Sequence, residues 1–286
     1  AYDNLELIVI DGGSTDESVQ VIQRYANQIH YWVSEPDRGQ THAINKGLEH
    51  CTGEVWSYLN SDDLLTPGSL AIVAEHFESN PDLQWLGGVS EVFDQNGHRG
   101  YVTPLNPAQK VDYLTPWRRD YQYVVPCSNV SFMRREILEA VGYFDESYDY
   151  SMDIEYYTRV VFQLGIEPTL IPQVLGRWRW HEQSKTFQKG LAYGFREDEV
   201  SIAQQYLKAL TVQEQAWLQK QIREQGRWLV TRRAMVHRNQ GQRRAAMGEL
   251  LQGLKRFPDL LTFRPWYGAL RRCLLLPCSY RLQSKY

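Results

Sequence analysis

Three strand–turn–helix units follow one another in the first 80 residues, and each turn carries an aspartate. Short apolar runs bounded by Gly, Pro, Asn and Ser are typical of buried strands. The expected strands are residues 5–10, 29–34 and 54–59. They lead into Asp11, Asp37 and the pair Asp62–Asp63. Since ligands of such α/β units bind at the carboxyl ends of strands, the pattern predicts an open parallel sheet with these aspartates along one edge.

The adjacent carboxylates Asp62 and Asp63 limit the kinds of ligand that this edge of the sheet could bind. Two like charges side by side repel each other and lose hydration, so they need a cation, a polyhydroxyl ligand or backbone donors. Hard oxygen ligands at a strand end indicate a divalent metal and a phosphorylated ligand. The alternative is that Asp63 caps the helix expected over residues 67–80.

Two more candidate residues lie further along the chain. Asp153 falls in the first turn of a helix expected to begin near Ser151, where the helix dipole favours a carboxylate; its alternative role is only to satisfy that helix terminus. His181 follows a strand expected over residues 170–180, although a lone histidine is more often structural than a ligand.

Local patterns predict further elements. A helix is expected over residues 40–49, and the helix that carries Asp153 is expected to end at Gly165. The Asp94–Gly97 turn predicts a hairpin, and the prolines of residues 104–117 predict a surface loop.

The composition is that of an ordinary globular chain. Its 286 residues are 43% hydrophobic and 23% charged, and no run approaches the roughly 18 apolar residues that a membrane span needs. The four cysteines match no CxxC metal spacing, which favours reduced thiols in the cytoplasm.

Charge divides the chain in two. Residues 1–206 carry 15 Lys and Arg against 30 Asp and Glu, whereas residues 207–286 carry 16 against 4. Helical periodicity dominates after Gly190, so we expect an α/β domain over residues 1–189 and a basic helical extension over 190–286.

The last apolar, arginine-rich segment of the extension, LLTFRPWYGALRRCLLLPC, has the composition of an interfacial amphipathic element, which predicts peripheral membrane contact. The alternative, slightly favoured, is ordinary helices that pack on the acidic domain with arginines outward or in ion pairs. Nucleic acid is a poor fit because no binding motif accompanies the basic residues.

Three motifs in order resemble the nucleotide-sugar half of a family 2 glycosyltransferase with the GT-A fold: DGGSTD at 11–16, SEPDRGQTHAINKGL at 34–48 and LNSDD at 59–63. The resemblance covers roughly residues 1–185. It implies a Rossmann-like α/β fold, a mixed and mostly parallel sheet flanked by helices, followed here by the helical extension. In that family a strand with a Thr/Ser-Tyr-Asn turn precedes DGGSTD, so the chain is expected to be N-terminally truncated.

The resemblance also implies roles for the donor-side residues. Asp11 would accept hydrogen bonds from the base, and Asp62 would bind ribose or donor-sugar hydroxyls. Asp63 would coordinate Mg²⁺ or Mn²⁺ bridging the diphosphate. The residues implied at the base and ribose side are Asp37, Asn45 and Lys46.

On the acceptor side, RREILEAVGYFDE followed by DIEYYTRV resembles the segment whose first aspartate is the catalytic base. That position is Asp153, with Glu155 as runner-up; Met152 stands where many members have a second acid. His181 is the implied second metal ligand, and Lys185 the implied diphosphate contact.

These expectations describe an inverting, metal-dependent glycosyltransferase of polysaccharide or glycolipid biosynthesis. Its partners would be a nucleoside-diphosphate-sugar donor and a sugar or lipid-linked acceptor, in the cytoplasm or at the inner face of the membrane. The competing function is nucleotide-sugar binding without transfer. A nucleotidyltransferase is less favoured because no Gly-rich basic phosphate loop stands near the start.

Overall fold

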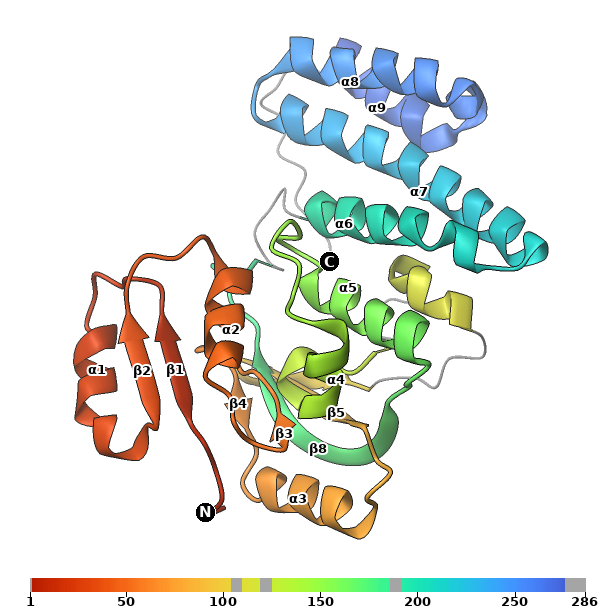
Figure 1. Cartoon of the computed structure of the whole chain (residues 1–286). Coiled ribbons are helices and arrows are strands. Elements are labelled where there is room, and N and C mark those ends of the chain that lie inside the picture. Colours follow the sequence, from red (N-terminus) through yellow and green to blue (C-terminus); the bar gives the residue numbers. More distant parts are fainter. Residues whose placement is uncertain (1, 104–109, 119–124, 186–191, 276–286) are drawn as a thin grey trace. The chain divides into compact units, whose positions relative to one another are not determined.

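The structure is a computed structural model that describes residues 2–103, 110–118, 125–185 and 192–275. Two compact units divide the chain, Ala1–Ser184 and Lys185–Tyr286 (Figure 1). The predicted domain boundary between residues 189 and 190 lies outside the described residues.

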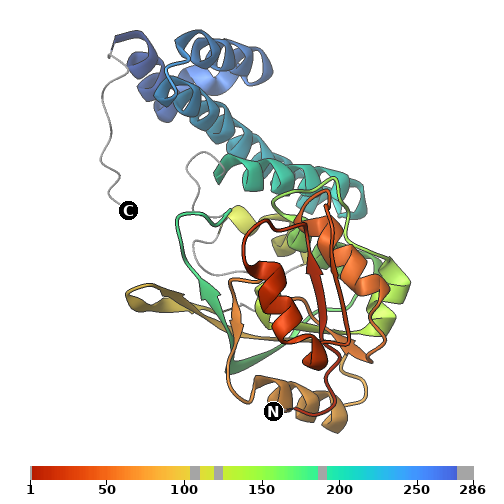
Figure 2. The same cartoon turned by 90° about the vertical axis from the view of Figure 1, so that its left-hand side faces the viewer.

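The N-terminal unit begins with a two-stranded parallel sheet. Strand β1 (Ile8–Asp11) pairs with β2 (Tyr31–Ser34), and helices α1 (Ser18–Arg24) and α2 (Gln40–Glu49) lie on opposite sides of the pair (Figures 1 and 2). The turn after β1 contains Gly13 at φ 86°, a conformation that glycine adopts without steric cost. The predicted bounds of α2 are confirmed.

The remaining strands form a six-stranded sheet in the order β3-β7-β5-β8-β4, with β6 beside β5. They are β3 (Val55–Trp56), β4 (Leu64–Leu65), β5 (Trp85–Asp94), β6 (Gly97–Val102), β7 (Ser131–Arg134) and β8 (Thr169–Arg179). Only the β5–β8 pairing of this sheet is parallel. The mixed α/β class is confirmed, but the expectation of mostly parallel pairing is wrong, because apolar runs buried on both faces do not encode strand direction.

Helices cover both faces of this sheet, as the alternation along β5 requires. Leu86 points into a cluster with Phe77 of α3 (Ser69–Ser79), whereas the neighbouring Trp85 lies 4.9 Å, ring centroid to centroid, from Tyr157 of α5 (Met152–Arg159). Helix α4 (Arg135–Val141) lies on the same side as α5 (Figure 1). The helix α5 continues as a π turn to Leu164 and ends at Gly165, as predicted.

A segment expected from its prolines to be a surface loop, residues 104–117, is in part buried. Two 3-10 helices, Lys110–Leu114 and Pro116–Arg118, occupy its described end. Val111, Tyr113 and Leu114 are at most 3% exposed. That prediction is wrong for residues 110–117, and residues 104–109 lie outside the described part.

The C-terminal unit is helical. Its main helices are α6 (Ala192–Gln205), α7 (Val212–Asn239), α8 (Arg243–Arg256) and α9 (Arg264–Leu275). Thr211 and Glu214 form a reciprocal capping box that starts α7. Short 3-10 turns, Leu207–Ala209 and Pro258–Thr262, join α6 to α7 and α8 to α9.

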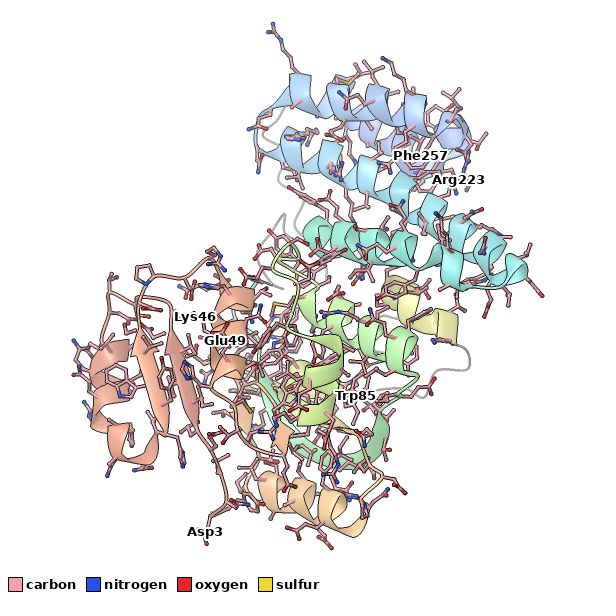
Figure 3. All side chains as sticks on the ribbon, viewed as in Figure 1. Asp3, Lys46, Glu49, Trp85, Arg223 and Phe257 are labelled. Atoms are coloured by element: carbon pink, nitrogen blue, oxygen red, sulfur yellow. The ribbon has the colours of Figure 1, made fainter. Side chains whose placement is uncertain are left out.

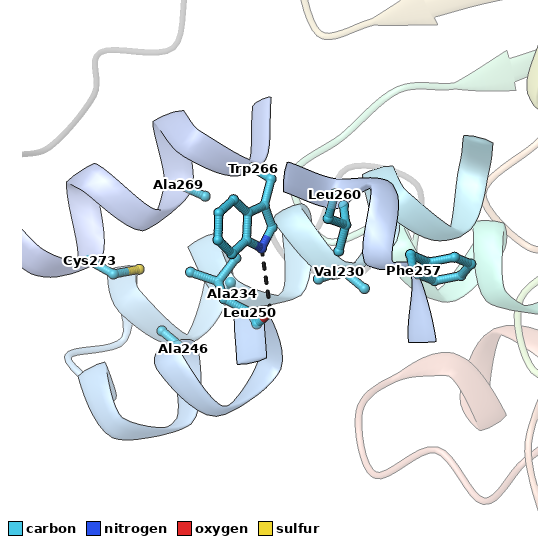
Figure 4. Close-up of a cluster of buried hydrophobic side chains, with 9 residues drawn as sticks. All are labelled: Val230, Ala234, Ala246, Leu250, Phe257, Leu260, Trp266, Ala269 and Cys273. Atoms are coloured by element: carbon cyan, nitrogen blue, oxygen red, sulfur yellow. Dashed lines mark hydrogen bonds between the residues drawn. The ribbon is translucent and has the colours of Figure 1, made fainter. Parts of the chain in front are cut away.

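The apolar side of α9 packs inside this unit. Trp266, Ala269 and Cys273 are at most 3% exposed in a cluster with α7 and α8, and the Trp266 indole donates a hydrogen bond to the Leu250 carbonyl at 3.4 Å (Figure 4). The described part of the final apolar segment therefore contributes to a helical core. Among the described residues, no helix has the length and apolar character that crossing a bilayer requires.

Candidate active site

The turn between β3 and β4 holds Asp63 in a buried position. The Asp63 backbone N–H donates to the Asn60 carbonyl at 3.1 Å, and the Arg179 backbone N–H donates to Asp63 Oδ1 at 3.0 Å. The residue is 5% exposed. Burial, together with the neighbouring Asp62 charge, raises the pKa of Asp63 to about 6. A cation beside this carboxylate would remove that penalty.

The exposed partner of the pair is Asp62. Its Oδ2 lies 2.8 Å from Nε2 of His181, and both side chains remain about one third exposed, 37% and 33%. Its backbone carbonyl accepts a hydrogen bond from Arg179 Nε at 3.0 Å. The histidine predicted as a metal ligand is thus brought to this aspartate, while Asp63 lies one residue further along, beneath the Arg179 backbone.

The donor set fits a divalent cation of the kind that the resemblance implies. Asp62 and His181 offer an accessible carboxylate and imidazole side by side, and Asp63 adds a buried carboxylate next in sequence. Within the described ranges, no group of three or more His, Cys, Asp or Glu side chains is arranged to hold a metal ion by itself. Mg²⁺ sites commonly use one or two carboxylates and complete their shell with water and substrate phosphates. The described residues would therefore hold a metal together with a diphosphate.

At the end of β1, the Asp11 carboxylate organises its own turn. It accepts hydrogen bonds from the Gly13 and Ser14 backbone N–H groups at 3.1 and 2.9 Å, and from the Ser14 and Ser34 hydroxyls at 2.5 and 2.7 Å. The two hydroxyls do most to lower the pKa of Asp11 to about 2. Three of these four bonds go to Oδ2, so Oδ1, which accepts the Ser14 hydroxyl, retains an acceptor position.

The next turn places Asp37 against the Asp11 turn. Asp37 Oδ1 accepts the Gly39 N–H at 2.8 Å, and Oδ2 lies so close to Gly12 that a Cβ there would come within 2.4 Å of it. The absence of a side chain at Gly12 thus lets the two aspartate turns meet. The predicted role of both aspartates at one ligand stays a prediction.

Two residues predicted at the base and ribose side are engaged within the protein. Asn45 is 7% exposed; its amide donates to the Phe144 carbonyl at 2.9 Å and accepts the Phe144 N–H at 3.0 Å. Lys46 Nζ, labelled on α2 in Figure 3, lies 2.6 Å from Glu35 Oε1. Asn45 therefore holds the segment before α5 onto α2 and has no polar atom left for a nucleotide, which corrects its predicted role. Lys46 remains close to the Asp37 turn through Glu35.

Asp153 lies in the first turn of α5, where its Oδ1 accepts the Ile154 N–H at 2.9 Å. Burial raises its pKa to about 6. The charges of Asp153 and Asp63 both contribute, after burial, to raising the pKa of Cys127 to about 12 and that of Tyr58 well above its usual value. The charges of both carboxylates thus act on the same two groups, Tyr58 and Cys127.

The sequence reasoning missed Tyr58, Cys127 and the Arg179 contacts. Tyr58 falls in the strand expected over residues 54–59, but β3 ends at Trp56. Arg179 contacts the aspartate pair because β8 pairs with β4, and the sequence does not show this pairing. Of the two other predicted residues, Glu155 forms an ion pair with Arg159 at 2.7 Å, and Lys185 is the first residue of the C-terminal unit.

The fold is that of a mixed α/β domain in which aspartates stand at the end of β1 and in the turns after β2 and β3. The sequence model of glycosyl transferase family 2 matches residues 1–142. Through these residues the chain belongs to glycosyltransferase family 2.

Known proteins similar to this chain agree with that assignment. An uncharacterized glycosyltransferase of Mycobacterium tuberculosis is 29% identical over 174 residues, 60% of this chain and 62% of that protein. The O-antigen biosynthesis protein RfbC of Myxococcus xanthus is 29% identical over 152 residues, 52% of this chain and 11% of RfbC. This chain therefore spans 62% of the length of the M. tuberculosis relative.

Solved structures support the fold. S. aureus TarS 1–349 in complex with UDP-GlcNAc matches with a TM-score of 0.53 and 14% sequence identity, over 93% of this chain and 82% of the TarS chain. At that identity the likeness concerns the fold alone, and it confirms the predicted GT-A class.

Proposed function

We propose that this chain transfers a sugar from a nucleoside-diphosphate-sugar to an acceptor hydroxyl, with inversion at the anomeric carbon. The observation that carries the proposal is the contact between Asp62 and His181, 2.8 Å apart beside the buried Asp63. The same unit holds Asp153 in the first turn of α5, with a raised pKa. A buried carboxylate beside a cation-type site suits a leaving diphosphate, and a carboxylate with a raised pKa suits a general base.

In the proposed reaction, Asp153 takes the proton of the acceptor hydroxyl. That oxygen then bonds to the anomeric carbon while the bond to the diphosphate oxygen breaks, and the electron pair leaves with the diphosphate. With a pKa of about 6, Asp153 is mostly ionised at neutral pH but basic enough to accept a proton. Asp62, Asp63 and His181 would hold a Mg²⁺ or Mn²⁺ ion, which when bound neutralises the charge that develops on the diphosphate.

The substrate classes rest on the similar proteins. TarS was solved with UDP-GlcNAc, so UDP-sugars are the first donors to test. RfbC is named for O-antigen biosynthesis, which favours a polysaccharide or lipid-linked acceptor here.

The test uses donor hydrolysis, in which water replaces the unidentified acceptor. We expect release of nucleoside diphosphate from one donor of a panel, and a drop of about 10²–10⁴-fold in Asp153→Asn. The affinity of Asp153→Asn for that donor, measured by calorimetry, should stay within about twofold of the wild type because only the base is lost. Asp145→Asn, an exposed turn carboxylate, is the matched control.

Other results would select the alternatives. Equal loss of turnover and binding in Asp153→Asn would make Asp153 structural. A wild-type chain that binds a donor but never turns it over would be a nucleotide-sugar-binding protein without transfer activity. A chain that binds no donor would overturn both functions.

A further inference from the structure

A hollow with a volume of about 680 Å³ lies within the C-terminal unit, between α6, α7 and the end of α8. Pockets of about 300–1,000 Å³ accept small organic ligands. Neither the family match, which ends at residue 142, nor the proposed transfer reaction accounts for it.

The sequence shapes this hollow in two ways. At Gly226 in α7, a Cβ would come within 2.5 Å of the Phe257 ring, so glycine allows that ring to form a wall (Figure 3). At the opposite side, an ion pair between Glu197 of α6 and Arg233 of α7 ties the two helices together. The helices are thus joined at the Leu207–Ala209 turn and again at this ion pair, and the hollow lies between.

Its floor is apolar. Val200, Leu229, Val230 and Phe257 line it, and each is at most 9% exposed. Neutral polar side chains, Gln204 among them, stand at the exposed margin.

Its rim is basic. The cations that line it are Lys220, Arg223, Arg233 and Arg256, and the lining carboxylate is Glu197. Glu197 is neutralised by Arg233, and Asp259 pairs with Arg223 at 2.9 Å. Within the described ranges, Lys220 and Arg256 form no ion pair with a carboxylate. The Arg256 guanidinium carbon lies over the Phe257 ring, 5.3 Å from its centroid. Two exposed positive charges thus stand beside an apolar wall.

We propose that this hollow binds an anionic membrane phospholipid, with an acyl chain on the apolar floor and the phosphate at the rim formed by Lys220 and Arg256. A polar metabolite would need a charged floor, and a plain hydrocarbon would need a neutral rim. An apolar floor with a basic rim instead complements an amphiphile that has an anionic head group. The site does not depend on transfer activity, and it is distinct from α9, whose apolar side is already buried.

The test titrates the full chain with short-chain lipids below their critical micelle concentration. Dihexanoyl-phosphatidylglycerol is the anionic probe, dihexanoyl-phosphatidylcholine the zwitterionic one, and inorganic phosphate the head group alone. Each cation would make a charge-assisted contact with the lipid phosphate, so the double variant Lys220→Gln/Arg256→Gln should weaken binding by roughly tenfold or more. Arg232→Gln/Arg244→Gln removes the same charge from exposed positions outside the hollow and should change binding less than about twofold.

A second pair of variants tests the location. Gln204→Trp places an indole at the margin of the hollow and should block binding, whereas Gln252→Trp on the exposed side of α8 should not. Equal losses in the two double variants, undiminished binding in Gln204→Trp, or equal affinity for both lipids would each overturn the proposal. So would competition by inorganic phosphate at the lipid's own concentration, or binding of an acidic amphipathic peptide in place of lipid.

Discussion

His181 Nε2 lies 2.8 Å from Asp62 Oδ2, although 119 positions separate the two residues in the sequence. The contact exists because β8 runs antiparallel to β4, with Arg177 opposite Leu64, and so returns the chain to the aspartate pair. Arg179 stabilises the same crossing through its backbone N–H to Asp63 and its side chain to the Asp62 carbonyl.

His181→Ala should therefore weaken metal-dependent binding of a nucleoside diphosphate by about tenfold or more, because one of two accessible ligands is lost. Binding without metal should be unchanged. Calorimetric titrations with Mn²⁺ and with chelator measure both quantities, and His76→Ala on α3 serves as the control. A loss that is the same with and without metal would show that His181 is not a ligand.

Asp63→Asn should stabilise the metal-free protein at pH 8. The pKa of Asp63 is about 6 in the folded protein and lower in the unfolded chain, so the folded state binds the proton more tightly. The ionised carboxylate therefore destabilises the fold above pH 6, and this cost shrinks as the pH falls from 6 to 4. Urea unfolding at pH 8 should show a gain on the order of 2–3 kcal/mol for Asp63→Asn, disappearing near pH 4.

The matched control for that series is Asp3→Asn, which changes an exposed aspartate. Asn can still accept the Arg179 N–H, so the turn is retained in the variant. If the free energies of unfolding of Asp63→Asn and the wild type differ by the same amount at every pH, burial does not raise the pKa of Asp63.

Gly12→Ala should impair nucleotide binding. The new Cβ would meet the Asp37 carboxylate at 2.4 Å, so that carboxylate must move from its position beside the Asp11 turn. Calorimetric titration with the nucleotide that the wild type binds measures the affinity of the variant. Gly248→Ala, which meets nothing within 4 Å on α8, is the matched control and should leave binding unchanged. Normal affinity in Gly12→Ala would place the nucleotide away from Asp37.

Asn45→Ala should lower the free energy of unfolding by about 2–4 kcal/mol, because both the N–H and the C=O of Phe144 lose a buried partner. Nucleotide affinity of the folded protein should change less than about twofold. Asn96→Ala in the exposed β5–β6 turn is the control. Unchanged stability with weakened nucleotide binding would instead favour the donor-site role first predicted for Asn45.

Much of this protein could be anticipated from its sequence. The periodicity of residues 40–49 defined α2, because helix bounds follow local turn chemistry and apolar spacing. The Asp94–Gly97 turn and its flanking apolar runs defined the β5–β6 hairpin for the same reason. The aspartates at 11, 37, 62 and 63 stood out because carboxylates at strand ends are costly without a ligand.

Tertiary structure decided the rest. Strand direction in the six-stranded sheet, the contact of His181 with Asp62 and the use of Asn45 by Phe144 all join residues far apart in the chain. A side chain's available hydrogen-bonding groups depend on what folds against it, and local sequence does not record those partners. The sequence alone therefore determined which residues carry chemistry, while the fold decided which of them are free to use it.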